Sequence, residues 1–483
     1  MTALRHQKTK IVGTVGPASD SQEMLERLID AGLNIVRLNF AHGDHASHAE
    51  VVKRVRMAAA GRDRRVAILG DLPGPKMRIG KLDPDPVCLI DGAPFCLTTR
   101  MVVGDESHAS LSFDALPNVV SPGDKIFLND GFIQLNVERI EGTDVHTVVA
   151  VGGELRSNKG VNFPGIDLGV SAFTEQDHEH LRFAKEMDLD AVSQSFVRSA
   201  DDIRTVRRAA QDLDFDPLLI AKIERAEAID HIEDILDEAD GIMVARGDLG
   251  VEIPIEDVAP IQKRLIRAAN LVGKPVITAT QMLESMTQNS RPTRAEATDV
   301  ANAIFDGTDC VMLSGETATG RYPTEAVATM RRIAERTEPL ASSSELVNIL
   351  ERAKTMGWLS KEDLTPFTAF WLARELDACA LVVPTKDGRT PRRMSRFRPQ
   401  VWVLAVASDE EMCRKLEFSY GVHGVVGTKP PAGWVAYVRT LLTELGINGD
   451  IAVLVRTAAG IEDGYSSHFD IVDLKPGTAD LRP

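Results

Sequence analysis

The chain contains eight short apolar runs, each of which ends in polar or charged residues. The runs are 10–14, 34–39, 66–71, 191–196, 218–224, 241–248, 275–280 and 310–316. Most segments between them, such as 21–31 and 226–239, repeat apolar residues at intervals of three and four, which is typical of amphipathic helices. Eight strand-helix repeats are the number that a (β/α)8 barrel requires. A doubly wound open sheet has the same alternation, but the count and the polar strand ends favour the barrel.

The alternation of strand and helix patterns is interrupted between the third and fourth apolar runs. Residues 73–170 carry alternating apolar segments such as 133–137 and 145–151, separated by turn signals rich in Gly, Pro and Asp. This pattern predicts an inserted β-barrel lid domain, placed to swing over the end of the barrel where chemistry occurs. Helix and strand patterns resume at 341–483 as a separate α/β domain, a candidate regulatory part. We therefore assign 1–72 and 171–340 to the barrel.

Composition narrows the classes of partner. The formal charge is 55 minus 71, or −16, whereas binding to nucleic acid or to an anionic membrane needs a basic surface. The five cysteines include no C-x-x-C pair, so neither a disulfide framework nor a zinc site is indicated. No signal peptide and no apolar stretch of about 18 residues is present. We expect a cytoplasmic protein that binds neither nucleic acid nor membranes.

Ionisable residues follow neighbouring strands in the middle of the chain. Glu224 and Asp248 end two successive runs, and a pair of carboxylates with water and substrate oxygens suits Mg²⁺. Ordinary ion pairs are the alternative explanation. Lys222 precedes Glu224 by two residues, so both side chains point to the same face of the strand. A cation there would meet a substrate bound to the metal.

Two further segments suit anionic ligands. Arg246, Gly247 and Asp248 are expected to begin a helical turn whose free N–H groups bind a carboxylate, although a lone R-G-D is weak evidence. Arg37 ends the second strand, where its planar guanidinium fits phosphate oxygens.

Taken with the segment 37–43, Arg-Leu-Asn-Phe-Ala-His-Gly, these motifs resemble the pyruvate kinase family, in its bacterial form, from Lys10 to Val327. The resemblance implies a phosphotransferase that moves the phosphoryl group of phosphoenolpyruvate to ADP, giving pyruvate and ATP in glycolysis. It also implies a homotetramer.

The resemblance assigns roles to individual residues. Lys222, Arg37 and Thr280 would be catalytic, with Thr280 relaying a proton to C3 of the enolate and Ser314 and Glu316 as candidates to continue the relay. Glu224 and Asp248 would hold Mg²⁺ or Mn²⁺. The substrate would be bound by Arg37, Lys222, Ala245, Arg246, Gly247, Asp248 and Thr280. The nucleotide would be bound by Asn39, His42, Arg78 and Lys159. A buried, backbone-bonded threonine and a structural histidine remain the plainer explanations for Thr280 and His42.

One departure from the family pattern concerns a monovalent cation. Potassium-dependent members hold K⁺ at positions that match Asn39, Ala41, Asp71 and Leu72, so two hydroxyl ligands are missing here. Lys76 stands where those members commonly have Glu and resembles the potassium-independent branch. We expect the Lys76 ammonium, paired with Asp71, to substitute for K⁺, with an exposed, mobile lysine as the alternative.

The C-terminal region holds a candidate effector loop. By resemblance, a phosphorylated effector would bind there, but Asp387 occupies a position where a hydroxyl residue is usual. A solvated basic face is the alternative. The residues concerned are Thr385, Lys386, Gly388, Arg389 and Thr390.

Two other functions remain open on sequence grounds. A metal-dependent aldolase or lyase would also hold a pyruvate enolate, but it would need neither the lid nor Lys159. A non-catalytic effector-binding protein would not need Lys222, Glu224 and Thr280.

Overall fold

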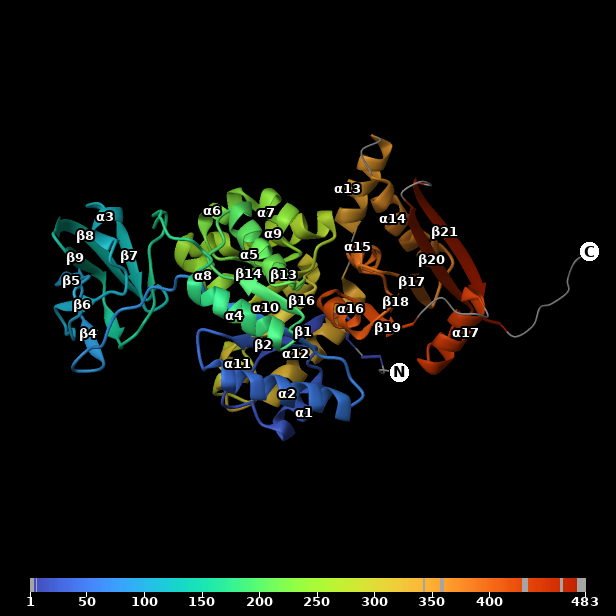
Figure 1. Cartoon of the computed structure of the whole chain (residues 1–483), viewed down its shortest axis with the longest axis horizontal. Helices are drawn as coiled ribbons and strands as arrows, with labels where there is room; N and C mark the ends of the chain where they lie inside the picture. The colour runs from blue at the N-terminus through green and yellow to red at the C-terminus, as the bar shows by residue number, and fades with distance from the viewer. Residues whose placement is uncertain are drawn as a thin grey trace, which may run out of the picture.

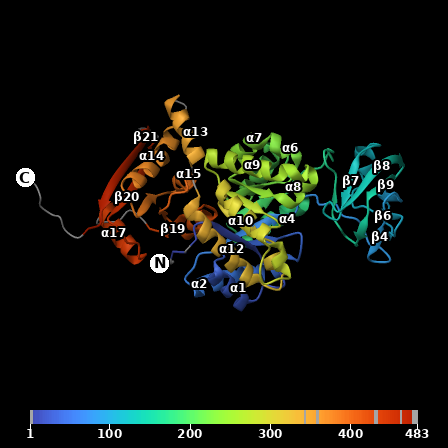
Figure 2. The same ribbon diagram turned by 180° about the vertical axis from the view of Figure 1, so that it is seen from behind.

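The structure is a computed structural model that describes residues 4–5, 7–341, 344–356, 360–427, 433–460 and 464–475. Its parts lie in a row, with a small sheet domain on one side of a central barrel and an α/β domain on the other (Figures 1 and 2). No helix in these ranges is long and apolar enough to cross a membrane.

The central part is a closed barrel of eight parallel strands, which confirms the (β/α)8 prediction. The order around the barrel is β1-β16-β15-β14-β13-β12-β3-β2. The strands are β1 (Lys10–Thr14), β2 (Ile35–Asn39), β3 (Ala67–Leu72), β12 (Ala191–Gln194), β13 (Leu218–Ile223), β14 (Gly241–Ala245), β15 (Val276–Ala279) and β16 (Cys310–Leu313). Each predicted run contains one of these strands or all but one residue of it.

Helices surround this barrel. They are α1 (Gln22–Ala31), α2 (His45–Gly61), α4 (Glu175–Glu186), α5 (Ala200–Asp212), α6 (Ala226–Asp230), α7 (Ile232–Glu238), α8 (Arg246–Glu252), α9 (Val258–Val272), α10 (Arg294–Asp306), α11 (Gly315–Ala318) and α12 (Pro323–Thr337). Helix α10 begins with the predicted capping box of Thr293 and Glu296. The segment 226–239 forms two helices instead of one, because the backbone leaves the helical region at His231, with φ −103° and ψ 18°.

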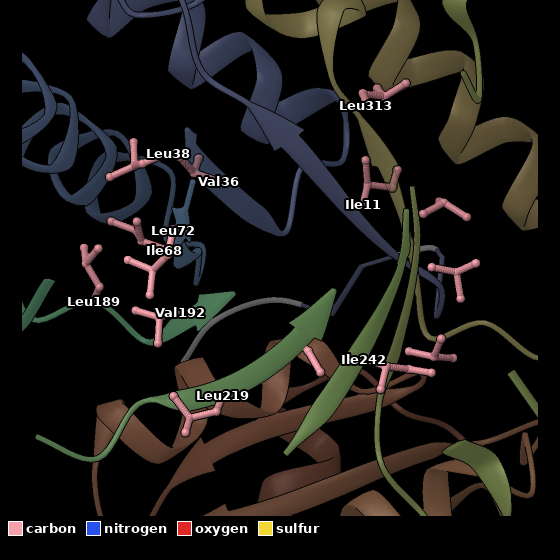
Figure 3. Packing of buried hydrophobic residues seen from close by; sticks show 14 of the residues in the cluster. Ile11, Val36, Leu38, Ile68, Leu72, Leu189, Val192, Leu219, Ile242 and Leu313 are labelled. Atoms are coloured by element: carbon pink, nitrogen blue, oxygen red, sulfur yellow. The ribbon is translucent and has the colours of Figure 1, made fainter. Parts of the chain in front are cut away.

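Two apolar layers hold the barrel together. The outer layer packs strand residues against the helices and includes Ile11, Val36 and Ile68 (Figure 3). The inner layer fills the barrel with residues such as Val12, Leu69 and others from most strands. Branched apolar side chains therefore close the lower barrel, and polar side chains are left for its carboxyl end.

The lid is a sheet-rich insertion with its own apolar core. A six-stranded sheet has the order β11-β7-β8-β9-β5-β6, and β10 pairs with β4. The elements are β4 (Val87–Leu89), β5 (Pro94–Thr98), β6 (His108–Ser110), α3 (Leu116–Val119), β7 (Lys125–Leu128), β8 (Ile133–Glu141), β9 (Asp144–Val151), β10 (Gly153–Leu155) and β11 (Val161–Asn162).

The C-terminal part is an α/β domain, as expected. Its five-stranded sheet has the order β19-β18-β17-β20-β21, parallel except for the last pair. The elements are α13 (Ser344–Thr355), α14 (Lys361–Glu375), β17 (Ala380–Pro384), α15 (Arg389–Ser395), β18 (Trp402–Ala407), α16 (Glu410–Lys415), the 3₁₀ turn η4 (Leu416–Phe418), β19 (Val422–Val426), α17 (Trp434–Glu444), β20 (Ile451–Gly460) and β21 (Gly464–Asp473).

Candidate active site

A buried lysine lies at the centre of the polar end of the barrel. Lys222 Nζ is 2.8 Å from Glu224 Oε1 and 3.4 Å from Asp71 Oδ1, and it donates a hydrogen bond of 2.6 Å to Ser195 Oγ. Burial alone would lower its pKa, but the carboxylates of Asp71 and Glu224 raise the pKa of Lys222 to about 12. The side chain is therefore a fixed cation at the strand ends, as the sequence predicted.

Arg37 joins this group through Asp71. Its Nε donates to Asp71 Oδ2 at 3.0 Å, Nη2 contacts the same oxygen, and Nη1 donates to Thr14 Oγ1 at 3.0 Å. Asp71 is fully buried, but the charges of Arg37 and Lys222 outweigh burial and lower its pKa to about 2. One carboxylate thus lies between two cations that face the same space.

Glu224 is a buried carboxylate in a charged neighbourhood. Burial raises its pKa, Lys222 opposes that shift, and the negative charge of Asp248 adds to it. The Glu224 Oε2 atom accepts a hydrogen bond of 2.9 Å from the Phe196 N–H. Two like charges close enough to raise a pKa are relieved by a cation between them.

The donor set fits a hard divalent ion. Carboxylate oxygens are ligands for Mg²⁺ and Mn²⁺, and Mg²⁺ usually keeps water or substrate oxygens as well. In the described part of the chain, no cluster of three or more His, Cys, Asp or Glu side chains has the geometry of a metal site. Glu224 and Asp248 would therefore share the ion with ligands from outside the protein.

The predicted helical turn is helix α8, which starts at Arg246 directly after β14. Arg246 is fixed by an ion pair of 2.7 Å with Asp299 and by its Nη2 hydrogen bond to Thr280 O. The Gly247 N–H donates to Thr280 Oγ1 at 2.7 Å. The first turn of α8 is thus tied to the end of β15, and Ala245, the buried last residue of β14, precedes it.

Thr280 has a backbone conformation that β-branched residues rarely adopt. Its φ is 68°, and Gln281 follows with a φ of 53°. The Thr280 hydroxyl donates to Ala279 O at 2.6 Å and accepts from Gly247 N. Such strained residues concentrate at functional sites, because the surrounding structure must hold them.

Glu316 joins two loops at the barrel end through its buried carboxylate. Its buried carboxylate accepts hydrogen bonds from Leu283 N at 3.0 Å and Ser314 N at 2.8 Å. These bonds join the loop after β15 to the end of β16. The relay through Ser314 and Glu316 stays a prediction.

The predicted nucleotide residues lie on the loop after β2 and on the lid segments next to the barrel. Asn39 Oδ1 accepts from Ala41 N at 3.2 Å, and burial together with the charges of Arg78, Lys76 and Arg37 lowers the pKa of His42. Arg78 Nη1 donates to Asn158 O at 3.0 Å, next to Lys159 on the lid. His42 and Arg78 are thus electrostatic neighbours, whereas Lys159 forms none of the side-chain bonds found in the described residues.

Lys76 does not pair with Asp71. The Asp71 carboxylate is engaged by Arg37, Lys222 and Ser193, and Lys76 is exposed and forms no ion pair within the described residues. The predicted pairing is not found, because Arg37 from the adjacent strand β2 and Lys222 from β13, two strands away, both reach Asp71. Lys76 lies four residues beyond the end of β3. Its charge nevertheless contributes to the field at His42.

The candidate effector loop satisfies its own polar groups. Gly388 N donates to Thr385 Oγ1 at 2.9 Å, and Asp387 accepts from Arg389 N at 3.0 Å and pairs with the Arg389 guanidinium at 3.2 Å. The charge of Asp387 is therefore neutralised within the loop, while the Arg389 side chain is 79 % exposed.

Sequence reasoning missed two serines of the site. Ser195 accepts from Lys222, and Ser193 Oγ donates to Asp71 Oδ1 at 2.6 Å. Ser193 lies on β12 and Ser195 directly follows that strand, so their spacing of two could have indicated a shared face. Serine is too common, however, to single out without the register.

Comparisons with known proteins agree on one family. The model of the pyruvate kinase barrel domain matches residues 6–327, and the model of the pyruvate kinase alpha/beta domain matches residues 366–470. A pyruvate kinase of Thermococcus litoralis is 47 % identical over 428 residues, which cover 87 % of this chain and 89 % of that protein. A pyruvate kinase of Geobacillus stearothermophilus is 44 % identical over 480 residues, covering 98 % of this chain and 78 % of that protein.

Proposed function

Because the chain belongs to the pyruvate kinase family, we propose that the polar end of its barrel transfers the phosphoryl group of phosphoenolpyruvate to ADP with the residues described above. The protein is a phosphotransferase of glycolysis that forms pyruvate and ATP. The observation that carries the residue assignment is Lys222, a buried cation held between Asp71 and Glu224.

The charge that develops during phosphoryl transfer explains why Lys222 and Arg37 would lie at the polar end of the barrel. When the bond between the enol oxygen and phosphorus breaks, negative charge develops on that oxygen and on the phosphoryl oxygens. Lys222 is held by its carboxylate partners in the charged form, so it stabilises this charge without reorganisation. Arg37 offers its planar guanidinium to the phosphoryl oxygens from the neighbouring side.

Residues of α8 and β15 would position the rest of the substrate. The start of α8 would face the carboxylate of phosphoenolpyruvate, and the Gly247 N–H would exchange its present partner, Thr280 Oγ1, for a substrate oxygen. The Thr280 hydroxyl, next to this turn, would pass a proton toward C3 when the enolate becomes pyruvate. The lid would carry Lys159 toward the nucleotide phosphates and exclude water that would hydrolyse the donor.

Pyruvate kinases use a divalent metal ion, which bound to Glu224 and Asp248 would supply Lewis-acid stabilisation of the substrate oxygens. We propose Mg²⁺ or Mn²⁺ on the oxygen-only donor set. The buried Glu224 carboxylate, whose pKa is raised by burial and by the negative charge of the half-buried Asp248, supports this assignment.

A coupled assay tests the assignment. Pyruvate formation from phosphoenolpyruvate should require both ADP and Mg²⁺. Lys222→Met should lower kcat roughly 10²- to 10³-fold, the usual cost of losing one preorganised donor at developing charge. The exposed Lys53→Met variant is the control. Wild-type transfer by the Lys222→Met enzyme would refute the role, and pyruvate release without ADP would favour a lyase.

We also propose that K⁺ is not required. Asp71 is occupied by Arg37 and Lys222, and positions 41 and 72 lack hydroxyls, so the site offers few oxygens to K⁺. Lys76 would add its positive charge to the same region, as its influence on His42 indicates. Activity should persist in buffers free of K⁺ and NH₄⁺, and Lys76→Glu should lower it. Near-complete dependence on K⁺, unmatched by a tetraalkylammonium salt, would exclude the proposal.

Three further features of the family complete the proposal. They are a cytoplasmic location, a homotetramer, and a phosphorylated effector bound near Lys386 and Arg389. The exposed Arg389 side chain supports the last of these. Sedimentation measures the assembly, and activation by sugar phosphates that is lost in Arg389→Ala tests the effector loop.

A further inference from the structure

Strand β12 and the residue that follows it contribute two hydroxyl groups, those of Ser193 and Ser195, to the polar end of the barrel. Ser193 is fully buried and Ser195 is 3 % exposed. Both hydroxyls reach side chains inside the barrel end, as their hydrogen bonds show. Ser193 donates to Asp71 Oδ1 and Ser195 accepts from Lys222 Nζ, each at 2.6 Å. The end of β12 and the residue directly after it therefore contact both members of the Asp71–Lys222 pair.

The two carboxylate oxygens of Asp71 have separate partners. Oδ2 accepts from Arg37, whereas Oδ1 accepts from Ser193 and lies 3.4 Å from Lys222 Nζ. Ser193 and Asp71 are direct neighbours in the register of β12 and β3. Because neighbouring parallel strands are fixed by their ladder, the Ser193 hydroxyl sets the rotation of the Asp71 carboxylate with little freedom.

This rotation decides how Lys222 is shared. Lys222 lies closer to Glu224, at 2.8 Å, than to Asp71. Without the Ser193 hydroxyl, Asp71 Oδ1 would be left with Lys222 as its remaining partner. A buried carboxylate that loses a hydrogen bond turns toward the nearest cation, since an unpaired charge is costly there. Lys222 would then be drawn toward Asp71 and away from the transferring group.

We propose that Ser193 is a positioning residue for phosphoryl transfer, which holds Asp71 so that Lys222 and Arg37 both remain directed at the substrate. The inference rests on the proposed function of Lys222. It extends that function to a residue without its own contact to the reacting atoms.

The test compares Ser193→Ala with Ser193→Thr, which keeps the hydroxyl. Ser193→Ala removes a hydrogen bond to a charged group, and such bonds contribute appreciably to the free energy. We therefore expect kcat per folded site to fall about tenfold in Ser193→Ala. KM for phosphoenolpyruvate should change by less than about threefold, because the lost contribution is made mainly in the transition state. Ser193→Thr should recover most of kcat.

Ser395→Ala is the matched control. Ser395 is also a buried serine beside a buried aspartate, with Ser395 Oγ 3.3 Å from Asp309 Oδ1, but it lies in helix α15, outside the barrel mouth. It should lose stability without losing kcat. Thermal unfolding of each variant gives the folded fraction.

Two outcomes would overturn the proposal. The first is a folded Ser193→Ala enzyme with the wild-type kcat. The second is an equal loss of kcat in folded Ser193→Ala and Ser193→Thr, which would indicate a steric effect. Failure of the wild-type enzyme to form pyruvate would instead refute the proposed function.

Discussion

The barrel holds its two neighbouring domains in different ways. The C-terminal domain inserts the side chain of Phe418 into the inner apolar layer of the barrel, where it is fully buried. The lid keeps a separate core and is joined to the barrel by two linkers. The linker that returns from the lid is held by Arg225, which donates to Ile166 O at 3.1 Å, and by Arg198, which donates to Val170 O at 3.0 Å.

The charged contacts of the two domains with the barrel differ in the same way, since the C-terminal domain contributes a buried contact and the lid linker an exposed one. Glu417, beside Phe418, is buried and accepts from Lys10 Nζ at 3.2 Å and from Asn34 Nδ2 at 3.2 Å. At the lid linker, Arg198 pairs at 3.1 Å with Asp167, whose side chain is 75 % exposed. Breaking a buried pair leaves an uncompensated charge, whereas an exposed pair contributes little. The C-terminal domain thus shares the core and buried charges of the barrel, whereas the lid keeps its own core and its linker carries an exposed ion pair.

The strongest test removes the lid. Replacing residues 77–165 with a short Gly/Ser linker should abolish kinase activity, because Lys159 and the cover that excludes water are lost. The barrel should still unfold cooperatively, since the lid core does not share the inner and outer layers. Circular dichroism and the coupled assay measure both effects. An active or unfolded variant would contradict the comparison.

The next largest effect is expected from removing the aromatic ring of Phe418, which the C-terminal domain inserts into the barrel. Phe418→Ala should lower the free energy of unfolding by about 3–5 kcal/mol, the usual cost of a buried Phe-to-Ala change. Phe132→Ala on the lid, where the ring is 70 % exposed, should change it by less than about 0.5 kcal/mol. Denaturant unfolding distinguishes the two. Equal effects would show that burial in the barrel does not fasten the C-terminal domain.

A smaller effect depends on pH. Burial raises the pKa of Glu252 from 4.5 to about 7, although Arg225, 3.3 Å away, opposes the shift. Between those values the folded protein binds more protons than the unfolded chain, so stability falls as pH rises from about 4.5 to about 7. Glu252→Gln, which resembles the neutral acid, should gain on the order of 1 kcal/mol over wild type at high pH and little at low pH.

Metal-free thermal unfolding at several pH values checks this result, with the exposed Glu256→Gln as the control. A gain for Glu252→Gln that is the same at all pH values would contradict the expectation.

The smallest expected change concerns Arg198, which contacts Asp167 and Val170 O on the lid linker. Arg198→Met should cost about 0–1 kcal/mol of stability, as expected for a partly exposed ion pair. Amide hydrogen exchange in residues 166–170 should nevertheless become faster, because Val170 O and Asp167 lose their common partner. Unchanged exchange would show that Arg198 does not restrain the linker.

Much of the site was predictable because its residues end strands. Lys222, Glu224 and Thr280 follow apolar runs at the barrel's carboxyl edge, and the spacing of two placed Lys222 beside Glu224 as observed. The contacts of Glu316 were not predictable in this way. Its two bonds to Leu283 and Ser314 depend on loop conformations that no periodicity encodes.

The sequence by itself determined the eight strands, the inserted lid and the α/β domain after it, because these depend on local periodicity and turn residues. It also determined which residues gather at one edge, since parallel strands share their carboxyl ends. Only the tertiary structure decided that Asp71 contacts Arg37 and Lys222 instead of Lys76, and that Ser193 holds it. These contacts join strands far apart in the chain, and they depend on barrel register and on competition between cations for one buried carboxylate.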